Sequence, residues 1–372
     1  MTLPEFHAQW QAELNQLAAQ EALRHTRGPL GTIDLSSNDY LGLGRDEALR
    51  NTVLQAWQAL AGRALNGATG SRLLTGHNEL VEALEADIAR WHGAEAALLY
   101  SSGYQANLGL LSGLNDRNQV IVYDQFVHAS LRDGLRLRLG GSFPFAHNDL
   151  NQLEDKLKQH PGALVLTETV FSMDGDLAPL DEMAGLCRKY GTLLLLDEAH
   201  GLGVLGEAGM GLWTQEYADV TLARVYPYGK AMGGHGAAVV GSRVLKQWLL
   251  NKSRPQIFST AVPPVQVLHL QYAYPRLRAA DAERAQLRAL AQAFVDAAGA
   301  RGWAERIIHP YAAIAGLRAP GNEAALQLAA DLQSRGYDIR AIRYPSVPRG
   351  AERLRICLHA FNSLAEVQGV FG

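Results

Sequence analysis

Cysteine is scarce in this chain of 372 residues, which contains only Cys187 and Cys357, far apart in the sequence. Two isolated cysteines provide neither a disulfide framework nor the spacing of a metal site, and they suit a reducing compartment. No run approaches the roughly 18 consecutive apolar residues that span a membrane, and no charged start followed by an apolar core opens the chain. The sequence therefore predicts a cytoplasmic protein without metal or membrane contacts.

An excess of charge of one sign is also missing, because 34 basic and 37 acidic residues give a formal net charge of -3. Such a balance offers no basic field for a phosphate backbone and argues against nucleic acid as a partner. The length exceeds the size at which a single core stops growing. We expect an N-terminal arm with a small segment (1–45), a large domain (46–275) and a C-terminal α+β domain (276–372).

What the sequence does contain is a regular alternation of amphipathic helical segments with short apolar runs. Runs this apolar are typical of parallel strands that helices cover on both faces. They lie at 96–100, 119–123, 163–167 and 192–197. The predicted fold class is therefore α/β, and ligands of such sheets bind at the carboxyl ends of the strands.

Polar residues that could bind a ligand or take part in a reaction follow three of these runs. Ser102, Gly103 and Tyr104 begin a helix after the first run, where backbone amides can bind a phosphate, although an ordinary helix cap would look the same. His128 follows the second run and suits stacking on a flat ring, with a capping or core histidine as the alternative. Asp197 ends the fourth run, and His200 follows it.

Two familiar patterns overlap at this last strand end. Asp197-Glu198-Ala199-His200 looks like the magnesium-binding strand of a helicase ATPase, but the chain has no G-x-x-x-x-G-K-[ST] phosphate loop. The glycines at 201, 203 and 206 match a dinucleotide fingerprint in letters only. That fingerprint must follow its strand directly and open a helix, which the intervening residues do not allow. We therefore expect neither an ATPase nor an NAD site.

Lys230 lies in a glycine-rich stretch, 229–236, just before a short apolar strand at 237–241. Alone, it could be a surface lysine in a loop, or a desolvated lysine that forms a Schiff base with a carbonyl cofactor. A phosphate site, a stacking histidine, an aspartate for a ring nitrogen and this lysine, all at strand ends, match the needs of pyridoxal 5'-phosphate (PLP). Together they favour the cofactor lysine.

Between about residues 30 and 365 the chain resembles the α-oxoamine synthases of the fold-type I PLP-dependent enzymes. The most specific stretches are 36–42, 70–76, 171–180, 197–206, and 229–230 with 236–238. The resemblance implies a large domain with a mostly parallel sheet between helices and a smaller α+β C-terminal domain. It also implies a cytoplasmic homodimer with shared active sites.

Roles in cofactor binding follow from the resemblance, position by position. Lys230 would hold PLP covalently and act as the proton-transfer base, Asp197 would pair with the pyridine nitrogen, and His128 would stack on the ring. Ser172 and His200 would donate hydrogen bonds to its phenolic oxygen. The phosphate would lie at the helix start formed by Ser102, Gly103 and Tyr104, with Thr260 of the other subunit.

The resemblance also implies the substrates: L-alanine and a pimeloyl thioester, carried on CoA or on a carrier protein, in biotin biosynthesis. Arg355 would bind the amino-acid carboxylate, with Asn38 nearby. The alternatives are a sister synthase that uses glycine or another amino acid, a fold-type I aminotransferase, and a cofactor-binding regulator.

One position departs from the family pattern. Pro227 stands where the family usually has Thr or Ser, whose hydroxyl would contact the phosphate, and proline also lacks an N–H. We expect weaker cofactor binding as a result, unless Tyr228 or Ser259 compensates.

Overall fold

The computed structural model describes residues 1–20, 22–26, 28–60, 66–308 and 310–372. Its contacts divide the chain into two compact units. The large unit comprises residues 38–287 and 359–361, and the terminal unit comprises residues 1–37, 288–358 and 362–372. The three domain ranges expected from the sequence stay a prediction.

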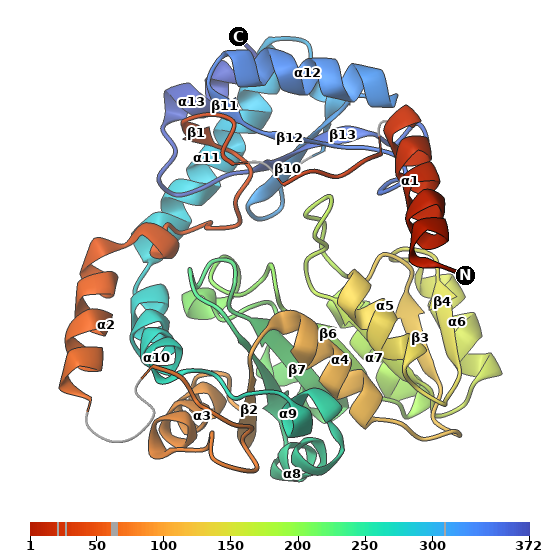
Figure 1. Cartoon of the computed structure of the whole chain (residues 1–372), viewed down its shortest axis with the longest axis vertical. Helices are drawn as coiled ribbons and strands as arrows, with labels where there is room; N and C mark the ends of the chain where they lie inside the picture. Colours follow the sequence, from red (N-terminus) through yellow and green to blue (C-terminus); the bar gives the residue numbers. More distant parts are fainter. Residues whose placement is uncertain (21, 27, 61–65, 309) are drawn as a thin grey trace. The chain divides into compact units, whose positions relative to one another are not determined.

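A seven-stranded sheet forms the centre of the large unit (Figure 1), with strand order β2-β8-β7-β6-β5-β3-β4. The strands are β2 (Ala96–Tyr100), β3 (Ile121–Asp124), β4 (Ser142–Phe145), β5 (Leu164–Glu168), β6 (Leu194–Asp197), β7 (Thr221–Pro227) and β8 (Ala237–Gly241). All pairs from β7 to β4 are parallel, whereas β8 is antiparallel to both β7 and β2. The predicted mostly parallel sheet is thus confirmed. The edge strand β2 pairs only with the antiparallel β8.

Helices cover both faces of this sheet because successive strand residues point to opposite sides. Leu164 and Leu166 pack in a core cluster with α4, α5 and α8, whereas Val165 packs in a second cluster with α6 and α7. The helices are α2 (Glu47–Ala59), α3 (Glu79–Trp91), α4 (Gly103–Gly113), α5 (Ala129–Arg136), α6 (Leu150–Gln159), α7 (Leu180–Tyr190), α8 (Arg243–Lys252), α9 (Arg254–Phe258) and α10 (Pro264–Arg278). Short 3-10 turns lie at Leu43–Arg45, Glu207–Gly209 and Gln215–Val220.

The terminal unit contains two small sheets. β1 (Ile33–Asp34) pairs in parallel with β11 (Tyr337–Asp338), and a four-stranded antiparallel sheet has the order β12-β13-β10-β9. Its strands are β9 (Ile307–Ile308), β10 (Ile314–Arg318), β12 (Arg340–Ile342) and β13 (Arg353–Cys357), and its helices are α1 (Leu3–Ala19), α12 (Asn322–Ser334) and α13 (Leu364–Gly369). A 3-10 turn lies at Ala304–Arg306, and α11 (Asp281–Ala300) has residues in both units. Among the described residues, no helix is long and apolar enough to cross a membrane.

Candidate active site

The predicted cofactor residues of the large unit follow neighbouring strands of its sheet. His128 follows β3, Asp197 ends β6, and Lys230 follows β7. Because β3, β5, β6 and β7 run in parallel side by side, their carboxyl ends lie along one edge of the sheet. The fold therefore brings residues that are far apart in the sequence to the same edge.

A chain of hydrogen bonds joins Asp197 to His128. Oδ1 of the buried Asp197 accepts a hydrogen bond from the backbone N of Ala199 at 2.9 Å, and its Oδ2 accepts one from Nδ2 of Asn107 at 2.8 Å. Asn107 Nδ2 also donates to Oγ of Ser130 at 2.9 Å, and that oxygen lies 2.8 Å from Nδ1 of His128. The predicted ring-stacking and nitrogen-pairing residues thus form one network.

Asn107 and Ser130 are functional candidates that the sequence reasoning missed. Asn107 is buried on the face of α4 that otherwise carries Ala106, Leu110 and Leu111. A polar residue on such an apolar face, one turn after the predicted phosphate-binding glycine, was the available signal.

We expect Asn107→Ala to slow turnover about ten-fold or more while the chain stays folded. The truncation leaves a buried oxygen of Asp197 without its donor, and an unsatisfied buried polar group costs ~1–3 kcal/mol. Steady-state turnover, with thermal unfolding measured alongside, checks this expectation. Turnover equal to that of the unchanged protein would show that Asn107 does not position Asp197.

Glu168 is a second missed residue. It ends β5, is almost fully buried, and lies directly opposite Asp197 in the pairing of β5 with β6. Its Oε1 accepts a hydrogen bond from the backbone N of His128 at 2.6 Å. Burial first, and then the charge of Asp197, raise the pKa of Glu168 well above its usual range, against a lowering effect of Lys230. The signal available in the sequence was a carboxylate directly after the third apolar run.

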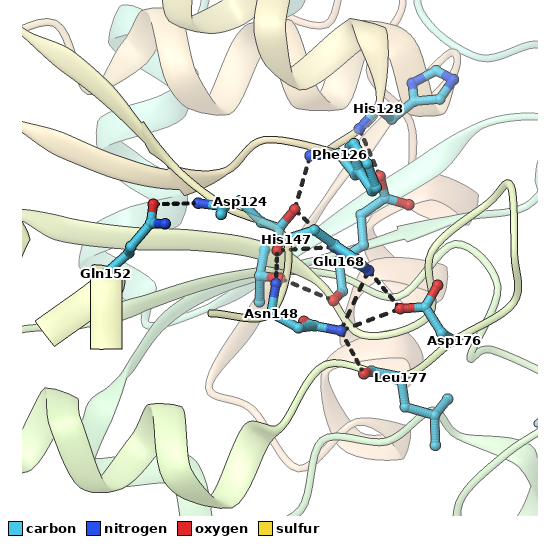
Figure 2. Close-up of polar contacts among 11 residues, drawn as sticks. Asp124, Phe126, His128, His147, Asn148, Gln152, Glu168, Asp176 and Leu177 are labelled. Atoms are coloured by element: carbon cyan, nitrogen blue, oxygen red, sulfur yellow. Dashed lines mark hydrogen bonds and ion pairs between the residues drawn. The ribbon is translucent and has the colours of Figure 1, made fainter. Parts of the chain in front are cut away.

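Lys230 belongs to the same electrostatic neighbourhood. The pKa of His128 is lowered first by desolvation and also by the charge of Lys230, whereas Asp197 raises it. Lys230 and Asp197 therefore both act on His128 and on Glu168. His128 is exposed as a residue, and its ring points away from Glu168 in Figure 2. Such a ring is accessible to a flat ligand.

The lysine turn is closed by backbone hydrogen bonds. The N of Gly233 donates to the carbonyl of Lys230 at 2.8 Å, and the N of Gly234 donates to the carbonyl of Tyr228 at 3.0 Å. Gly236 has a φ of +102°, which a residue with a side chain rarely adopts. Lys230 is half-buried in this turn, so it is less enclosed than the glycine-rich sequence suggested.

Tyr228 fastens the turn to the core. It is fully buried, and its hydroxyl accepts a hydrogen bond from the hydroxyl of Tyr274 at 3.0 Å. The Tyr274 hydroxyl also lies 2.9 Å from Nε2 of His92. Because its hydroxyl is part of this interior network, Tyr228 does not provide the compensating phosphate contact that the sequence suggested.

The helix start after β2 has the features of an anion site. Ser102 caps α4, its Oγ accepting from the backbone N of Gln105 at 3.2 Å, and the first N–H groups of a helix have no partner within it. A Cβ atom at Gly103 would come within 2.8 Å of Cβ of Pro227, so only glycine fits there. The Tyr104 side chain is exposed and donates to Asp133. Position 227 thus lies directly against the predicted phosphate site.

Thr260 is exposed and lines a small hollow on the large unit together with Arg72, Ser101 and Ser259. Nη1 of Arg72 lies 2.6 Å from Oε1 of the buried Glu85, so its charge is paired. The role of Thr260 toward the phosphate of another subunit stays a prediction.

His200 and Asn38 are linked through Tyr40, a residue whose role the sequence did not reveal. The buried hydroxyl of Tyr40 donates to Oδ1 of Asn38 at 2.9 Å and lies 2.7 Å from Nδ1 of His200. Ser172 is half-buried in the turn after β5, and its predicted contact stays a prediction. Arg355 lies on β13 of the terminal unit, where its Nη1 lies 2.9 Å from Sγ of Cys357, and its role in substrate binding also stays a prediction.

The ATPase-like acidic pattern at the end of β6 and the dinucleotide-like glycine pattern after it both have structural explanations. Glu198 accepts hydrogen bonds from Oγ1 of Thr169 at 2.6 Å and from the backbone N of Trp213 at 2.7 Å, and so holds the following loop. The glycines at 201, 203 and 206 lie in turns that lead to the 3-10 turn Glu207–Gly209. The stretch opens no α-helix, which is inconsistent with a dinucleotide fingerprint.

Comparison with known proteins agrees with this arrangement. The profile of the family "Aminotransferase class I and II" matches residues 31–370. A protein of Pasteurella multocida named "putative 8-amino-7-oxononanoate synthase" is 41% identical over 349 residues, which cover 90% of this chain and 87% of the relative. A protein of the same name from Neisseria meningitidis is 38% identical over 374 residues, which cover 96% of this chain and 97% of the relative.

Solved structures show the same architecture. Serine palmitoyltransferase of Sphingomonas wittichii is 29% identical with a TM-score of 0.89, covering 100% of this chain and 97% of its own. 8-Amino-7-oxononanoate synthase of Francisella tularensis is 26% identical with a TM-score of 0.78, covering 91% of this chain and 95% of its own. The chain therefore belongs to the aminotransferase class I and II family and, within it, to the fold-type I PLP-dependent acyltransferases that include the 8-amino-7-oxononanoate synthases.

Proposed function

We propose that this enzyme joins L-alanine to a pimeloyl thioester, with loss of carbon dioxide, to form 8-amino-7-oxononanoate for biotin biosynthesis. The observation that carries the proposal is the hydrogen-bonded network from Asp197 through Asn107 and Ser130 to His128, beside Lys230. The identity of 37–41% to relatives named for this synthase supports the choice of substrates.

The residues present fit PLP. Asp197 uses each carboxylate oxygen for one hydrogen bond, which leaves acceptor capacity for a protonated ring nitrogen. Oδ1 of Asn107 is buried and has no hydrogen-bond partner among the described residues, so the interior next to Asp197 can accept a further donor. Bound PLP would supply an aldehyde that reacts with amines and a ring that withdraws electrons from the substrate.

Each residue then has a chemical task. Lys230 would anchor the cofactor through its amine and, once released, take the α-proton of alanine. Asp197 would keep the ring nitrogen protonated, with Asn107 fixing the orientation of its carboxylate. Burial and the charge of Asp197 raise the pKa of Glu168, which disfavours a second negative charge next to Asp197.

The substrates can be tested directly through release of CoA. L-Alanine, glycine and L-serine are each offered with pimeloyl-CoA and with palmitoyl-CoA, and pimeloyl carrier protein is tested separately by product formation. We expect L-alanine with a pimeloyl thioester to give the highest kcat/KM. If none of the pairs releases CoA or forms product, while a keto acid accepts the amino group, the enzyme is an aminotransferase and the proposal is wrong.

A sister synthase is the second candidate, and the fold comparison favours it. The TM-score to serine palmitoyltransferase, 0.89, exceeds the 0.78 to 8-amino-7-oxononanoate synthase of Francisella tularensis. The same panel separates the two candidates, because preference for L-serine with palmitoyl-CoA would replace our assignment by the sister activity.

A homodimer working in the cytoplasm is part of the proposal. Thr260 is exposed on the large unit, as a residue that serves the partner's phosphate site would be before assembly. The mass in solution tests this directly, with about twice the 40.4 kDa of one chain expected.

Pro227→Thr is expected to tighten PLP binding about ten-fold or more. Position 227 lies against Gly103 at the predicted phosphate site, and a hydroxyl there would add one charge-assisted hydrogen bond, worth ~1.5–3 kcal/mol. Titration of the two apoenzymes with PLP, followed by visible absorbance, measures the difference. Equal affinities would mean that the proline does not weaken the site.

A further inference from the structure

Another histidine of the large unit, His147, lies between the carboxylates of Asp124 and Asp176 (Figure 2). Its Nδ1 lies 3.1 Å from both carboxylate oxygens of Asp124, and its Nε2 lies 2.6 Å from Oδ2 of Asp176. Asp124 is fully buried at the end of β3, whereas Asp176 belongs to the turn after β5. The ring of Phe126 stacks on the imidazole with ring centroids 4.6 Å apart, and the ring of Phe171 contacts it edge-on with centroids 4.4 Å apart.

Both carboxylates also bind the segment that carries this histidine. Oδ2 of Asp124 accepts from the backbone N of Asn148 at 2.8 Å. The Asn148 side chain donates to Oδ2 of Asp176 at 3.1 Å and to the carbonyl of Leu177 at 3.0 Å. Asn148 has a φ of +55°, a left-handed conformation that asparagine tolerates better than most residues. Residues 147 and 148 thus connect the end of β3, where the loop to His128 begins, to the loop after β5.

These two loops carry predicted cofactor contacts. His128 follows Asp124 in the first loop, where the Asp124 side chain also accepts from the backbone N of Phe126 at 2.8 Å. Ser172 lies in the second loop, which is closed by a hydrogen bond from the N of Phe171 to the carbonyl of Asp176 at 2.9 Å. A change at the connection would therefore alter the spacing between His128 and Ser172.

The geometry requires a charged imidazole. A neutral imidazole has one N–H donor, whereas both ring nitrogens of His147 face carboxylate oxygens and must both donate. Desolvation lowers the pKa of His147, but the hydrogen bonds and charges of Asp124 and Asp176 outweigh it and raise the pKa to about 9. The other neighbours, Phe126, Phe171 and Asn148, carry no charge.

We propose that His147 is a positioning residue of the active site, whose imidazolium binds Asp124 and Asp176 at once and thereby sets the spacing of His128 and Ser172. The inference rests on the proposed function, because those two residues contact a cofactor only if the enzyme binds PLP. Since folding raises the pKa of His147 above its ordinary 6.5, the stabilising interaction is complete below about pH 6.5. It is lost as the pH rises through about 9.

The test compares PLP affinities of the apoenzymes at about pH 7.5 and at about pH 10.5, on either side of the pKa. The variant is His147→Gln, and the matched control is His160→Gln just after α6, where His160 stacks on Phe143 with ring centroids 4.2 Å apart. At the lower pH we expect His147→Gln to weaken binding about ten-fold or more. At the higher pH the difference from the unchanged enzyme should shrink to within about two-fold, because that enzyme has also lost the charge. The control should match the unchanged enzyme at both values.

Two results would overturn the inference while the unchanged enzyme binds PLP normally. One is equal affinity of His147→Gln and the unchanged enzyme at the lower pH. The other is a loss of the same size at both pH values, which would mean that the imidazole acts by shape and not by charge. If the unchanged enzyme binds no PLP, the proposed function fails first, and this inference falls with it.

Asp176→Asn provides a second variant in case His147→Gln does not fold. It keeps the contact between His147 and Asp124 but removes one of the two carboxylates that raise the pKa of His147. We expect PLP affinity to fall several-fold, with the loss of binding at high pH beginning at a lower pH than in the unchanged enzyme. An unchanged affinity and pH profile would contradict the role of His147.

Discussion

Replacing Lys230 with alanine is expected to abolish turnover, lowering kcat by at least about four orders of magnitude. The variant lacks both the amine that anchors PLP and the base that takes the α-proton of the amino acid, and a positioned general base alone contributes ~10²–10⁴-fold. CoA release with L-alanine and pimeloyl-CoA measures the loss.

A matched control for this variant is Lys252→Ala at the exposed end of α8, where the lysine ammonium lies 5.5 Å from the ring centroid of Trp248. It removes the same side chain away from the proposed site, and we expect its turnover to stay within about two-fold of the unchanged enzyme. Appreciable activity of Lys230→Ala would mean that this lysine is not the catalytic base.

Replacing Asp197 with asparagine is expected to lower turnover by ~10²–10³-fold, the usual cost of removing one preorganised electrostatic group. The neutral amide cannot keep a ring nitrogen protonated. An amide has one acceptor oxygen, so it cannot accept both from Nδ2 of Asn107, which now donates to Oδ2 of Asp197 at 2.8 Å, and from the backbone N of Ala199. Turnover and thermal unfolding should therefore both be affected.

A double variant separates these two effects. Asn107→Asp combined with Asp197→Asn restores a donor facing an acceptor across the same contact but leaves no carboxylate at position 197. We expect the unfolding temperature to recover relative to Asp197→Asn alone, while turnover stays low. If Asp197→Asn keeps turnover within ten-fold of the unchanged enzyme, Asp197 does not have the proposed role.

The fold was largely predictable because its buried strands are short apolar runs between amphipathic helices. The runs before Gly103, His128 and Asp197 became β2, β3 and β6, and the carboxyl ends of β3 and β6 lie at the expected edge of the sheet. Strand pairing was less predictable. The antiparallel direction of β8 and the edge position of β2 depend on which strands become neighbours. Hydrophobic periodicity indicates that a segment is a strand but not which strand it pairs with.

Sequence reasoning found the residues whose chemistry is visible at a strand end but missed those that act through hydrogen bonds over long sequence distances. Asn107 reaches Asp197 across 90 positions, and Tyr40 reaches His200 across 160. Such contacts form only once the sheet has brought helices and loops together. His147 was missed for the same reason, since one of its two carboxylates ends β3 and the other lies in the turn after β5.

The proposed chemistry depends most directly on the attachment of PLP to Lys230. We would load the enzyme with PLP, reduce it with borohydride, digest it and locate the modified peptide by mass spectrometry. We expect reduced PLP on the peptide that contains Lys230, and no such modified peptide from Lys230→Ala. Absence of modification, or its presence on another lysine of the chain, would contradict the central claim.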